Sequence, residues 1–394
     1  MGRRSLAGGI TVLAVLATLS GCGLSGDNAA QQNTVSASSS VAIAIPYPQT
    51  GTYAEFGKEE KQGFDLALDK VNKEGGLKGK QLELKYYDTQ SDPKQSAAIA
   101  PKIAADQSVI AVLGDYSSPA SSAASPIYQK SKIVQYGFNS TADSYTQAGD
   151  YIWSPMYDTT DWSTYSADVV AKTGVKTVSV VYLETDWGKQ RFNAFKDEAA
   201  KQGVNIVYES AFLPDTSDYS PILIKARDAK PEAVVHIGYA PDGAQIANTL
   251  RDKLGYAGLY FGGLDAQEYL TNGGKNVENS ILNGDPPADT QEAREYQQAF
   301  KARYGTEPLG PATHAYQAII DLAYAANKTE PTREGILKAL QTVTDFPHLE
   351  GDGTPFAFDQ STRRPKGLLP SVLTVRNGQF VRISENDLAS IGKH

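Results

Sequence analysis

Residues 41 to 87 read VAIAIPYPQTGTYAEFGKEEKQGFDLALDKVNKEGGLKGKQLELKYY and contain three successive patterns. Residues 41–45 form a short apolar run of the kind found in buried strands, and residues 58–73 place apolar side chains at helical spacing. Residues 81–87 alternate between apolar and polar side chains, as a half-buried strand does. A strand, a helix and a second strand in this order predict a βαβ unit with parallel strands.

The same rhythm continues along the rest of the chain. A second helical segment follows at residues 93–105, where Asp92 is a good N-cap and Pro93 suits the first helical turn. About 350 residues follow residue 40, which is more than one hydrophobic core usually organises. The sequence therefore predicts an α/β fold of two doubly wound, parallel-sheet lobes. Further strands are expected at residues 109–113, 133–136, 177–182, 204–208, 233–237 and 259–261, and a helical stretch at 291–328 is expected to precede short strands at 356–359 and 371–382.

The first residues of the chain have the pattern of an export signal. Arg3 and Arg4 precede an uncharged apolar run at residues 6–19. Such a run is typical of a signal peptide and is short for a membrane-spanning helix. We therefore expect residues 1–21 to be a signal peptide.

The signal segment ends in Leu-Ser-Gly-Cys at residues 19–22, which resembles a lipobox, the motif whose cysteine becomes acylated. Cys22 is the only cysteine of the chain, so it has no internal disulfide partner. The residues that follow are rich in Ser, Ala, Gln and Asn, a composition that forms flexible linkers. We expect residues 22–40 to be a lipidated tether that anchors the protein to the outer face of the cell membrane. A chance cysteine in a discarded signal peptide is the alternative.

Composition and motifs argue against several classes of function. The net charge of −8 and the lack of a basic patch disfavour nucleic acid. The four histidines are scattered and show no metal-ligand spacing, and there is no P-loop, nucleophile elbow or dinucleotide-binding glycine motif. Glu59, Glu60 and Asp285 are most simply interpreted as solvated surface charges. The sequence thus predicts neither an enzyme nor a cofactor or metal site.

Binding chemistry is better represented, because polar loops follow several predicted strands. The loop Gly-Asp-Tyr-Ser-Ser-Pro at 114–119 leads into a helix, where amide and hydroxyl groups can hold an anion such as a carboxylate. Ligands of open α/β sheets bind at the carboxyl ends of the strands. Candidate ligand-binding residues at such ends are Tyr116, Ser117, Ser118, Asn139, Ser140, Thr141, Trp187, Tyr239 and Asp265.

Several of these segments, taken in order, resemble the type I periplasmic binding proteins of branched-chain amino acid ABC importers. The similarity covers nearly all of the chain after the tether. It is carried by residues 53–58, 72–80, 88–95, 114–118, 146–150, 187–188 and 377–381.

This resemblance implies two lobes joined by three hinge crossings that close on one small solute. We expect residues 41–157 and 286–345 in the N-terminal lobe, and residues 158–285 and 346–394 in the C-terminal lobe. The resemblance also implies a monomer whose partners are ABC permease and ATPase subunits.

The resemblance assigns roles to individual residues. Ser118 matches a serine that holds the ligand carboxylate, and Thr141 matches a threonine that contacts the carboxylate and the ammonium group. Trp187 matches an aromatic residue that closes over the ligand. The remaining matches are Phe56 in the side-chain pocket, Tyr239 in the second lobe and Asp158 near the first crossing.

One position departs from the family pattern. An acidic residue usually pairs with the ammonium group after the Phe-Gly-Gly segment at 261–263, but Leu264 stands there and Asp265 follows it. A buried ammonium group without a carboxylate partner is costly. Asp265 or Asp158 is therefore expected to take this role.

The leading hypothesis is a binder of an α-amino acid, branched-chain or related, that delivers it to a permease. Because of Leu264, a second hypothesis keeps the fold but replaces the solute by urea, a short amide or an aromatic carboxylate. A third is a sensory ectodomain that reports its ligand to a receptor. An enzyme comes last, because the sequence contains no catalytic constellation.

Overall fold

The computed structural model describes residues 40–391, apart from the side chain of Glu385. The expected signal peptide, Cys22 and the tether up to residue 39 lie outside the described residues. Within the described part, none of the helices combines the length and the apolar character needed to cross a membrane.

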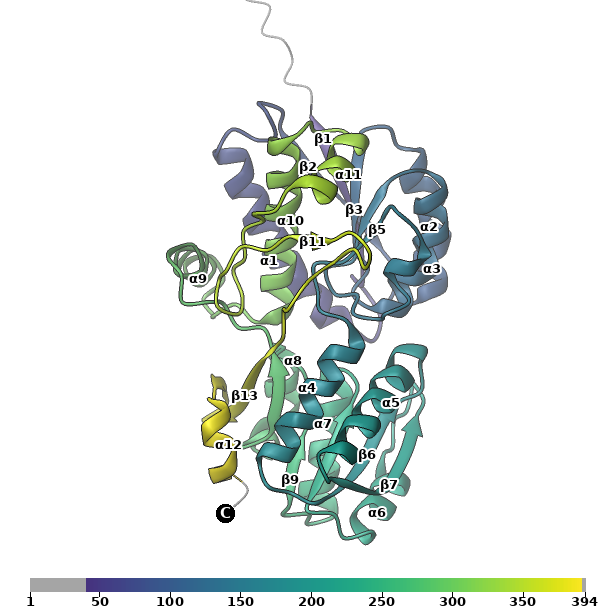
Figure 1. Ribbon diagram of the computed structural model, residues 1–394, viewed down its shortest axis with the longest axis vertical. Helices are drawn as coiled ribbons and strands as arrows, with labels where there is room; N and C mark the ends of the chain where they lie inside the picture. The colour runs from purple at the N-terminus through teal and green to yellow at the C-terminus, as the bar shows by residue number, and fades with distance from the viewer. Residues whose placement is uncertain (1–39, 392–394) are drawn as a thin grey trace, which may run out of the picture. The chain divides into compact units, whose positions relative to one another are not determined.

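The first lobe is built on a five-stranded parallel sheet (Figure 1). Its strand order is β2-β1-β3-β4-β5, so the first strand of the chain lies near the middle. The strands are β1 (Val41–Tyr47), β2 (Leu82–Asp88), β3 (Val109–Leu113), β4 (Val134–Tyr136) and β5 (Ile152–Trp153).

Helices cover both faces of this sheet, and the alternation of side chains along β1 shows how. Ile43 and Ile45 join a core with α1, α9, α10 and α11, whereas Ala42 and Ala44 join a core with α2 and α3. Both faces of β1 are therefore apolar, as in other sheets buried on two sides. The helices are α1 (Ala54–Lys73), α2 (Pro93–Ala105), α3 (Ser118–Lys130), α9 (Gln291–Tyr304), α10 (Gly310–Lys328) and α11 (Arg333–Thr342).

The second lobe contains a seven-stranded sheet in the order β14-β13-β10-β9-β8-β6-β7. Near one edge, β13 is antiparallel to both of its neighbours, β10 and β14, and all other pairs of neighbouring strands are parallel. The expected strands at 371–382 are thus sheet-edge strands. The strands are β6 (Thr177–Leu183), β7 (Asn205–Phe212), β8 (Ala233–Ile237), β9 (Leu259–Phe261), β10 (Ile281–Gly284), β13 (Ser371–Arg376) and β14 (Gln379–Arg382).

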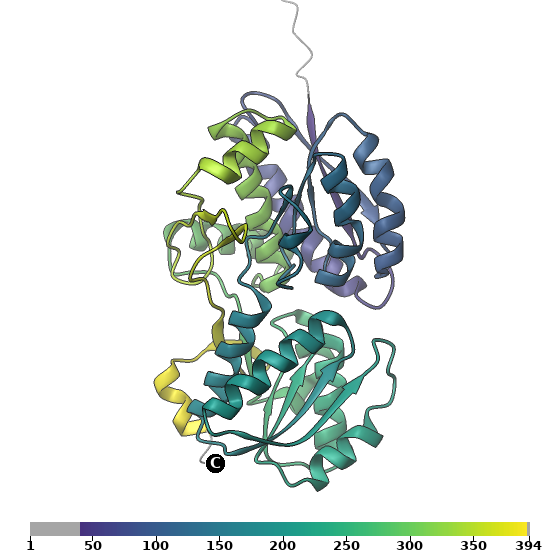
Figure 2. The same ribbon diagram turned by 45° about the vertical axis from the view of Figure 1, so that its right-hand side comes forward.

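Helices also cover both faces of the second sheet (Figure 2). One core joins the sheet to α4, α5 and α12, and the other joins it to α6, α7 and α8. These helices are α4 (Thr159–Lys172), α5 (Asp186–Lys201), α6 (Ser220–Asp228), α7 (Ala240–Asn248), α8 (Gln267–Gly273) and α12 (Glu385–Ile391). Short helical turns are η1 (Thr146–Ala148), η2 (Thr249–Lys253) and η3 (Gly274–Val277).

Three segments connect the two sheets, at residues 154–158, 285–290 and 366–370. The prediction placed residues from 346 onward in the C-terminal lobe. Phe346, Phe356 and Phe358 instead pack in the core of the first lobe. Phe358, on β11 (Phe358–Asp359), lies 5.3 Å from the ring of Trp153 and 6.1 Å from that of Tyr136, measured between centroids. We therefore propose that the third crossing begins after β12 (Arg364–Pro365).

Several elements differ from the prediction. The stretch at 291–328 is not one continuous helix, because α9 ends at Gly305, whose left-handed φ of 79° closes the helix. Helix α11 and strand β10 had not been predicted. The first turn of α1 begins at Ala54, four residues before the expected start at residue 58.

Replacing Phe358 by alanine tests whether this segment is part of the first lobe. The side chain is 6% exposed and contacts four aromatic rings, so its loss leaves a cavity. We expect the free energy of unfolding to fall by about 3 to 5 kcal/mol, measured by urea denaturation. The control Leu369→Ala removes a side chain that is 47% exposed and should change stability by less than about 0.5 kcal/mol. Equal effects of the two substitutions would contradict this packing.

Candidate functional site

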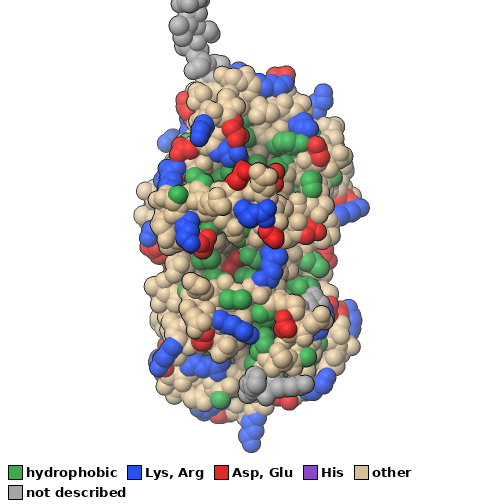
Figure 3. Space-filling view, turned by 90° about the vertical axis from the view of Figure 1, so that its left-hand side faces the viewer, with side chains coloured by type: hydrophobic (Ala, Val, Ile, Leu, Met, Phe, Trp, Pro, Cys, Tyr) green, Lys and Arg blue, Asp and Glu red, His purple; other side chains and the backbone are tan. Residues whose placement is uncertain are grey.

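A pocket opens between the two lobes at the carboxyl ends of their strands. It encloses about 590 Å³, including its open mouth. The surface narrows between the lobes, and hydrophobic side chains gather at this narrowing (Figure 3). We call this pocket the interlobe pocket. Its lining residues are Phe56, Tyr116, Ser118, Asn139, Thr141, Met156, Tyr157, Trp162, Trp187, Tyr239, Leu264, Asp265, Asn283, Gly284, Asp285, Gly310, Pro311 and His314.

The structure brings most of the candidate binding residues to this pocket, although they are far apart in sequence. They come from the start of α1, from the loops after β3, β4, β8 and β9, and from the first turn of α5. The candidates that line the pocket are Phe56, Tyr116, Ser118, Asn139, Thr141, Trp187, Tyr239 and Asp265.

Three other candidates do not line the pocket, because their side chains serve the local fold. Ser117 is the N-cap of α3, and its Oγ accepts a hydrogen bond from the amide of Ala120. Ser140 is buried and its hydroxyl donates to Ser121. Asp158 is the N-cap of α4, and its carboxylate accepts from the amide of Asp161 at 2.7 Å. A capping carboxylate is held at the helix end and is not directed at a solute.

The first lobe contributes hydroxyl groups to the pocket. Ser118 is the first residue of α3, and its Oγ accepts a hydrogen bond from the amide of Ala142 at 3.1 Å. The oxygen is thereby oriented while its proton stays available to a ligand. The N-terminus of α3 adds the positive end of a helix dipole. This side of the pocket therefore suits an anionic group.

Thr141 and Trp187 join the two lobes directly. The indole Nε1 of Trp187 donates to the Oγ1 of Thr141 at 2.9 Å. A second link across the cleft is the hydrogen bond from the amide of Gln267 to the carboxylate of Glu59 at 2.8 Å. The lobes thus lie in a closed arrangement around the interlobe pocket.

Aromatic side chains of the second lobe form one wall of the pocket. The rings of Trp187 and Tyr239 are stacked, with centroids 5.1 Å apart and an angle of 8° between the planes. Tyr239 also meets Tyr53 of the first lobe edge-on at 5.0 Å. Trp162 lies 6.2 Å from Trp187 and extends the wall. Such a surface suits an apolar ligand side chain.

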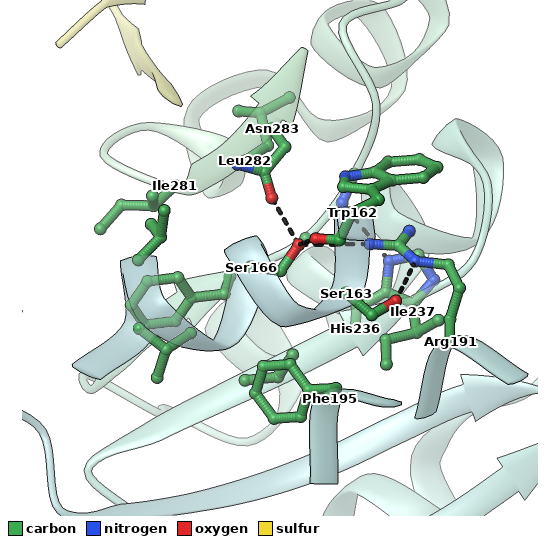
Figure 4. A pocket seen from close by; sticks show the side chains of 16 residues that line it. Trp162, Ser163, Ser166, Arg191, Phe195, His236, Ile237, Ile281, Leu282 and Asn283 are labelled. Carbon is green, nitrogen blue, oxygen red and sulfur yellow. Dashed lines mark hydrogen bonds between the residues drawn. The ribbon is translucent and has the colours of Figure 1, made fainter. Parts of the chain in front are cut away.

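A buried arginine supports this wall from behind (Figure 4). The guanidinium of Arg191 lies 3.6 Å from the ring centre of Trp162 and 5.4 Å from that of Trp187. Its nitrogens donate to the hydroxyls of Ser163 and Ser166, both at 3.4 Å. Burial lowers the pKa of Arg191 to about 9, which leaves it charged at neutral pH. The cation therefore holds both indole rings by cation–π attraction.

The opposite side of the pocket carries the acids Asp265 and Asp285, and Glu60 is hydrogen-bonded to the lining residue Asn139. One prediction about these acids was wrong. Glu60 and Asp285 had been interpreted as surface charges, but they are only 0% and 8% exposed. Helix α1 packs against α10, which buries Glu60, and Asp285 follows the buried strand β10. The carboxylate of Glu60 accepts from Asn139 Nδ2 at 2.7 Å, and that of Asp285 accepts from the hydroxyl of Tyr157 at 2.8 Å.

Asp265 lies on this acidic side, and glycines make room for it. A Cβ atom at Gly284 or Gly310 would come within 2.8 Å of the Asp265 carboxyl group. The carboxylate accepts a hydrogen bond from the amide of Asp285 at 3.1 Å. Burial, followed by the charge of Asp285, raises the pKa of Asp265 to about 7. Burial thus disfavours the ionised form of Asp265. A positive charge bound next to this carboxyl group would stabilise the ionised form.

Several lining residues had not been predicted. Asp285 follows β10, which carries only two strongly apolar residues and gave too weak a strand signal. Trp162 and His314 lie in the first turns of α4 and α10, where an aromatic or polar residue in a helix has no distinctive pattern. The pair Gly310-Pro311 could have indicated the start of α10, since proline is common in the first turn of a helix.

Comparisons with known proteins agree with this architecture. The family model for periplasmic binding proteins matches residues 40–369. The chain is 28% identical to Leu/Ile/Val-binding protein homolog 3 of Brucella melitensis over 268 residues, which cover 67% of this chain and 72% of that protein.

Solved structures give the same result. The leucine-binding protein LivK of Thermotoga maritima is 25% identical, with a TM-score of 0.79 over 87% of this chain and 98% of that chain. The substrate-binding protein LivJ of Streptococcus pneumoniae, solved with isoleucine, is 24% identical, with a TM-score of 0.76 over 87% of this chain and 100% of that chain.

Proposed function

Because this chain belongs to the periplasmic binding protein family, we propose that it is the solute-binding subunit of an ABC importer for an α-amino acid, branched-chain or related. The observation that supports this proposal most directly is that three chemically different surfaces line the interlobe pocket. Hydroxyl groups and a helix N-terminus lie on one side, a buried carboxylate lies on another, and aromatic rings lie between them. An α-amino acid has a carboxylate, an ammonium group and a side chain to match these three surfaces.

The ligand carboxylate is assigned to Ser118 and Thr141. The oxygen of Ser118 accepts from Ala142, and that of Thr141 accepts from Trp187 and Thr159. Both hydroxyl protons are then free to donate to an anion. Hydrogen bonds to a charged group are stronger than those between neutral groups.

The ligand ammonium group is assigned to Asp265. This residue is 7% exposed and lines the pocket, whereas Asp158 caps α4 outside it. A carboxylate in the ligand pocket also argues against urea or an aromatic carboxylate as the solute, since neither would compensate its charge.

The ligand side chain is assigned to the space between Phe56, Trp187 and Tyr239. These rings are held by packing across the closed lobes. An aliphatic side chain buried here gains from leaving water, by roughly 1.5 to 3 kcal/mol for a group the size of leucine. The aromatic wall therefore favours an apolar amino acid.

The N-terminal sequence supports a membrane-anchored subunit. We propose that the mature chain starts at an acylated Cys22 and is held at the outer face of the membrane, where it delivers its solute to permease and ATPase subunits. A single acyl chain binds membranes only marginally, so stable anchoring implies more than one chain on this residue.

The Ser118→Ala substitution tests the carboxylate assignment. Loss of one hydrogen bond to a charged group is expected to weaken amino-acid binding by about 1 to 3 kcal/mol, or roughly 5- to 150-fold in Kd. Isothermal titration with leucine, isoleucine and valine measures the change. The control Ser122→Ala alters the same helix away from the pocket and should leave Kd unchanged. Wild-type affinity in Ser118→Ala would show that the carboxylate binds elsewhere.

The pH dependence of binding tests the role of Asp265. Its pKa of about 7 in the free protein means that the acid is increasingly protonated below pH 7 and must lose its proton to pair with an ammonium group. Amino-acid affinity should therefore fall as the pH is lowered, by up to about tenfold per unit.

The Asp265→Asn variant is expected to bind weakly at every pH between 5 and 8. Asp158→Asn is the matched control, since asparagine also caps helices while the charge is removed. If Asp158→Asn weakened amino-acid binding as much as Asp265→Asn, the assignment of the ligand ammonium group to Asp265 would be wrong.

The Cys22→Ser substitution tests the lipid anchor. Without a thiol there is no acylation, so we expect the protein to move from the membrane fraction to the soluble fraction after cell lysis. Ser20→Ala keeps a small residue before the cysteine and should remain in the membrane fraction. Membrane association that survives Cys22→Ser would exclude this anchor.

A further inference from the structure

A compact group of side chains of the types that bind metals lies at the edge of the interlobe pocket, which two of its members also line. It consists of Asp285 from the second crossing, His314 from α10 and Glu350 from the segment after α11. Their ligand atoms all lie within 4.8 Å of one another. The second crossing pairs with the segment around Glu350 through the bridge between Pro287 and Glu350 and the hydrogen bond from the amide of Ala288 to the carbonyl of Leu349. The backbone therefore fixes the positions of these side chains.

The two distances from His314 to the carboxylates fit the spacing of ligands around a metal ion better than direct hydrogen bonds. His314 Nε2 lies 3.4 Å from Asp285 Oδ2 and 3.4 Å from Glu350 Oε1. Ionic hydrogen bonds between nitrogen and oxygen are shorter, at about 2.7 to 2.9 Å. Tetrahedral ligands bound at about 2.0 to 2.1 Å lie about 3.3 to 3.4 Å apart.

Unpartnered polar atoms mark the same place. His314 Nε2 and Glu350 Oε1 are buried without a hydrogen-bond partner, and so is Nδ1 of His348. His348 and Glu350 line one small cavity together with His314. Buried polar atoms almost always have a hydrogen-bond partner. His314 Nε2 and Glu350 Oε1 face each other at 3.4 Å without a hydrogen bond, which indicates a missing ligand between them.

The surroundings also orient the ligands. Nδ1 of His314 lies 2.8 Å from Oδ1 of Asn139, an acceptor, so this nitrogen carries the proton and Nε2 is the nitrogen that faces the acids. Metal-bound histidines usually donate their other ring nitrogen in this way. Tyr157 donates to Asp285 Oδ2 and fixes that carboxylate as well.

The charges of the region call for a cation. Glu60, Asp265, Asp285 and Glu350 are buried acids. Two histidines lie near them: His314, which is 3.4 Å from both Asp285 and Glu350, and His348, which interacts with Asp285. Burial raises the pKa of Glu350. Burial lowers the pKa of His314, but the charges of Glu350, Asp285 and Asp265 outweigh this and raise it to about 10, so the metal-free imidazole carries one positive charge among these four acids. An amino-acid ammonium group at Asp265 would supply only one positive charge.

We propose that Asp285, His314 and Glu350 form a site for a first-row divalent metal ion, with zinc as the best match. One imidazole and two carboxylates form a ligand set for zinc, whereas calcium and magnesium prefer oxygen ligands alone. The site joins the second crossing to the first lobe, next to the solute. Its ligands are at positions 285, 314 and 350, so no sequence spacing reveals it.

The test uses the purified full chain, stripped of metal by a chelator and freed of amino acids. Zinc, manganese and calcium chloride are titrated separately by calorimetry, and bound metal is measured by mass spectrometry. We expect one zinc per chain and at least about tenfold weaker binding of calcium. Zinc must displace protons from His314 and Glu350, so its affinity should rise with pH.

Two conservative variants locate the metal. His314→Gln and Glu350→Gln should each weaken zinc binding by at least about tenfold, while Asp289→Asn, which removes an exposed acid of the same crossing, should not. Thermal melting checks that each variant is folded, and Asp285→Asn replaces any variant that is not.

Zinc binding that is absent in the wild type, or equal in the wild type and the folded ligand variants, would overturn the proposal. In that case a protonated His314 forms ion pairs with Asp285 and Glu350. The imidazole should then remain protonated to high pH, which nuclear magnetic resonance can show. Amino-acid binding is measured separately in metal-free buffer, so failure of the metal site leaves the proposed function to its own test.

Discussion

A parallel strand cannot be joined to its neighbour by a tight turn, and both sheets of this protein consist mainly of parallel strands. Each strand must therefore be followed by a loop and a helix, and the loops gather at the carboxyl edge of the sheet. The three crossings bring the carboxyl edges of the two sheets to one pocket. Ser118, Thr141, Tyr239, Asp265 and Asp285 all come from such positions, although they span more than 160 residues of sequence.

The two lobes contribute different chemistry to the pocket. The first lobe supplies the hydroxyl groups of Ser118, at the start of α3, and of Thr141, after β4, and the second supplies the stacked rings of Trp187 and Tyr239. Closure brings these groups together, since the indole of Trp187 donates to the hydroxyl of Thr141. The same hydrogen bond orients Thr141 toward a ligand. Solute recognition and lobe closure thus depend on shared residues, as expected for a hinge protein that closes on its ligand.

Much of the fold could be predicted from local patterns. The boundaries of α2, β3, β8 and β9 agree with the prediction, because α2 has a strong cap, β3 is a continuous apolar run and β8 is apolar except for His236. Strand β10 was missed because Ile281 and Leu282 are too few to form a pattern. The segment carrying Phe358 had been assigned to the C-terminal lobe, because its contacts with Trp153 and Tyr136 of the first lobe are distant in sequence and leave no local pattern.

The site was less accessible to sequence reasoning. Ser118 and Thr141 came from the resemblance to a family, and periodicity could not tell that Ser118 lines the pocket while its neighbour Ser117 caps the helix. The burial of Glu60 and Asp285 depends on packing against elements that follow much later in the chain. Charged residues on a helix or in a loop are usually solvated, so only the tertiary structure could identify these two as buried.

The most direct test of the central claim is a calorimetric comparison of leucine with two analogues that each lack one charged group. Isoamylamine keeps the ammonium group and the side chain, and 4-methylpentanoic acid keeps the carboxylate and the side chain. If the pocket recognises an α-amino acid through separate hydroxyl and acidic surfaces, leucine should bind at least about 100-fold more tightly than either analogue. If the acid bound as tightly as leucine, Asp265 would have no role in recognition and the account of the pocket would be wrong.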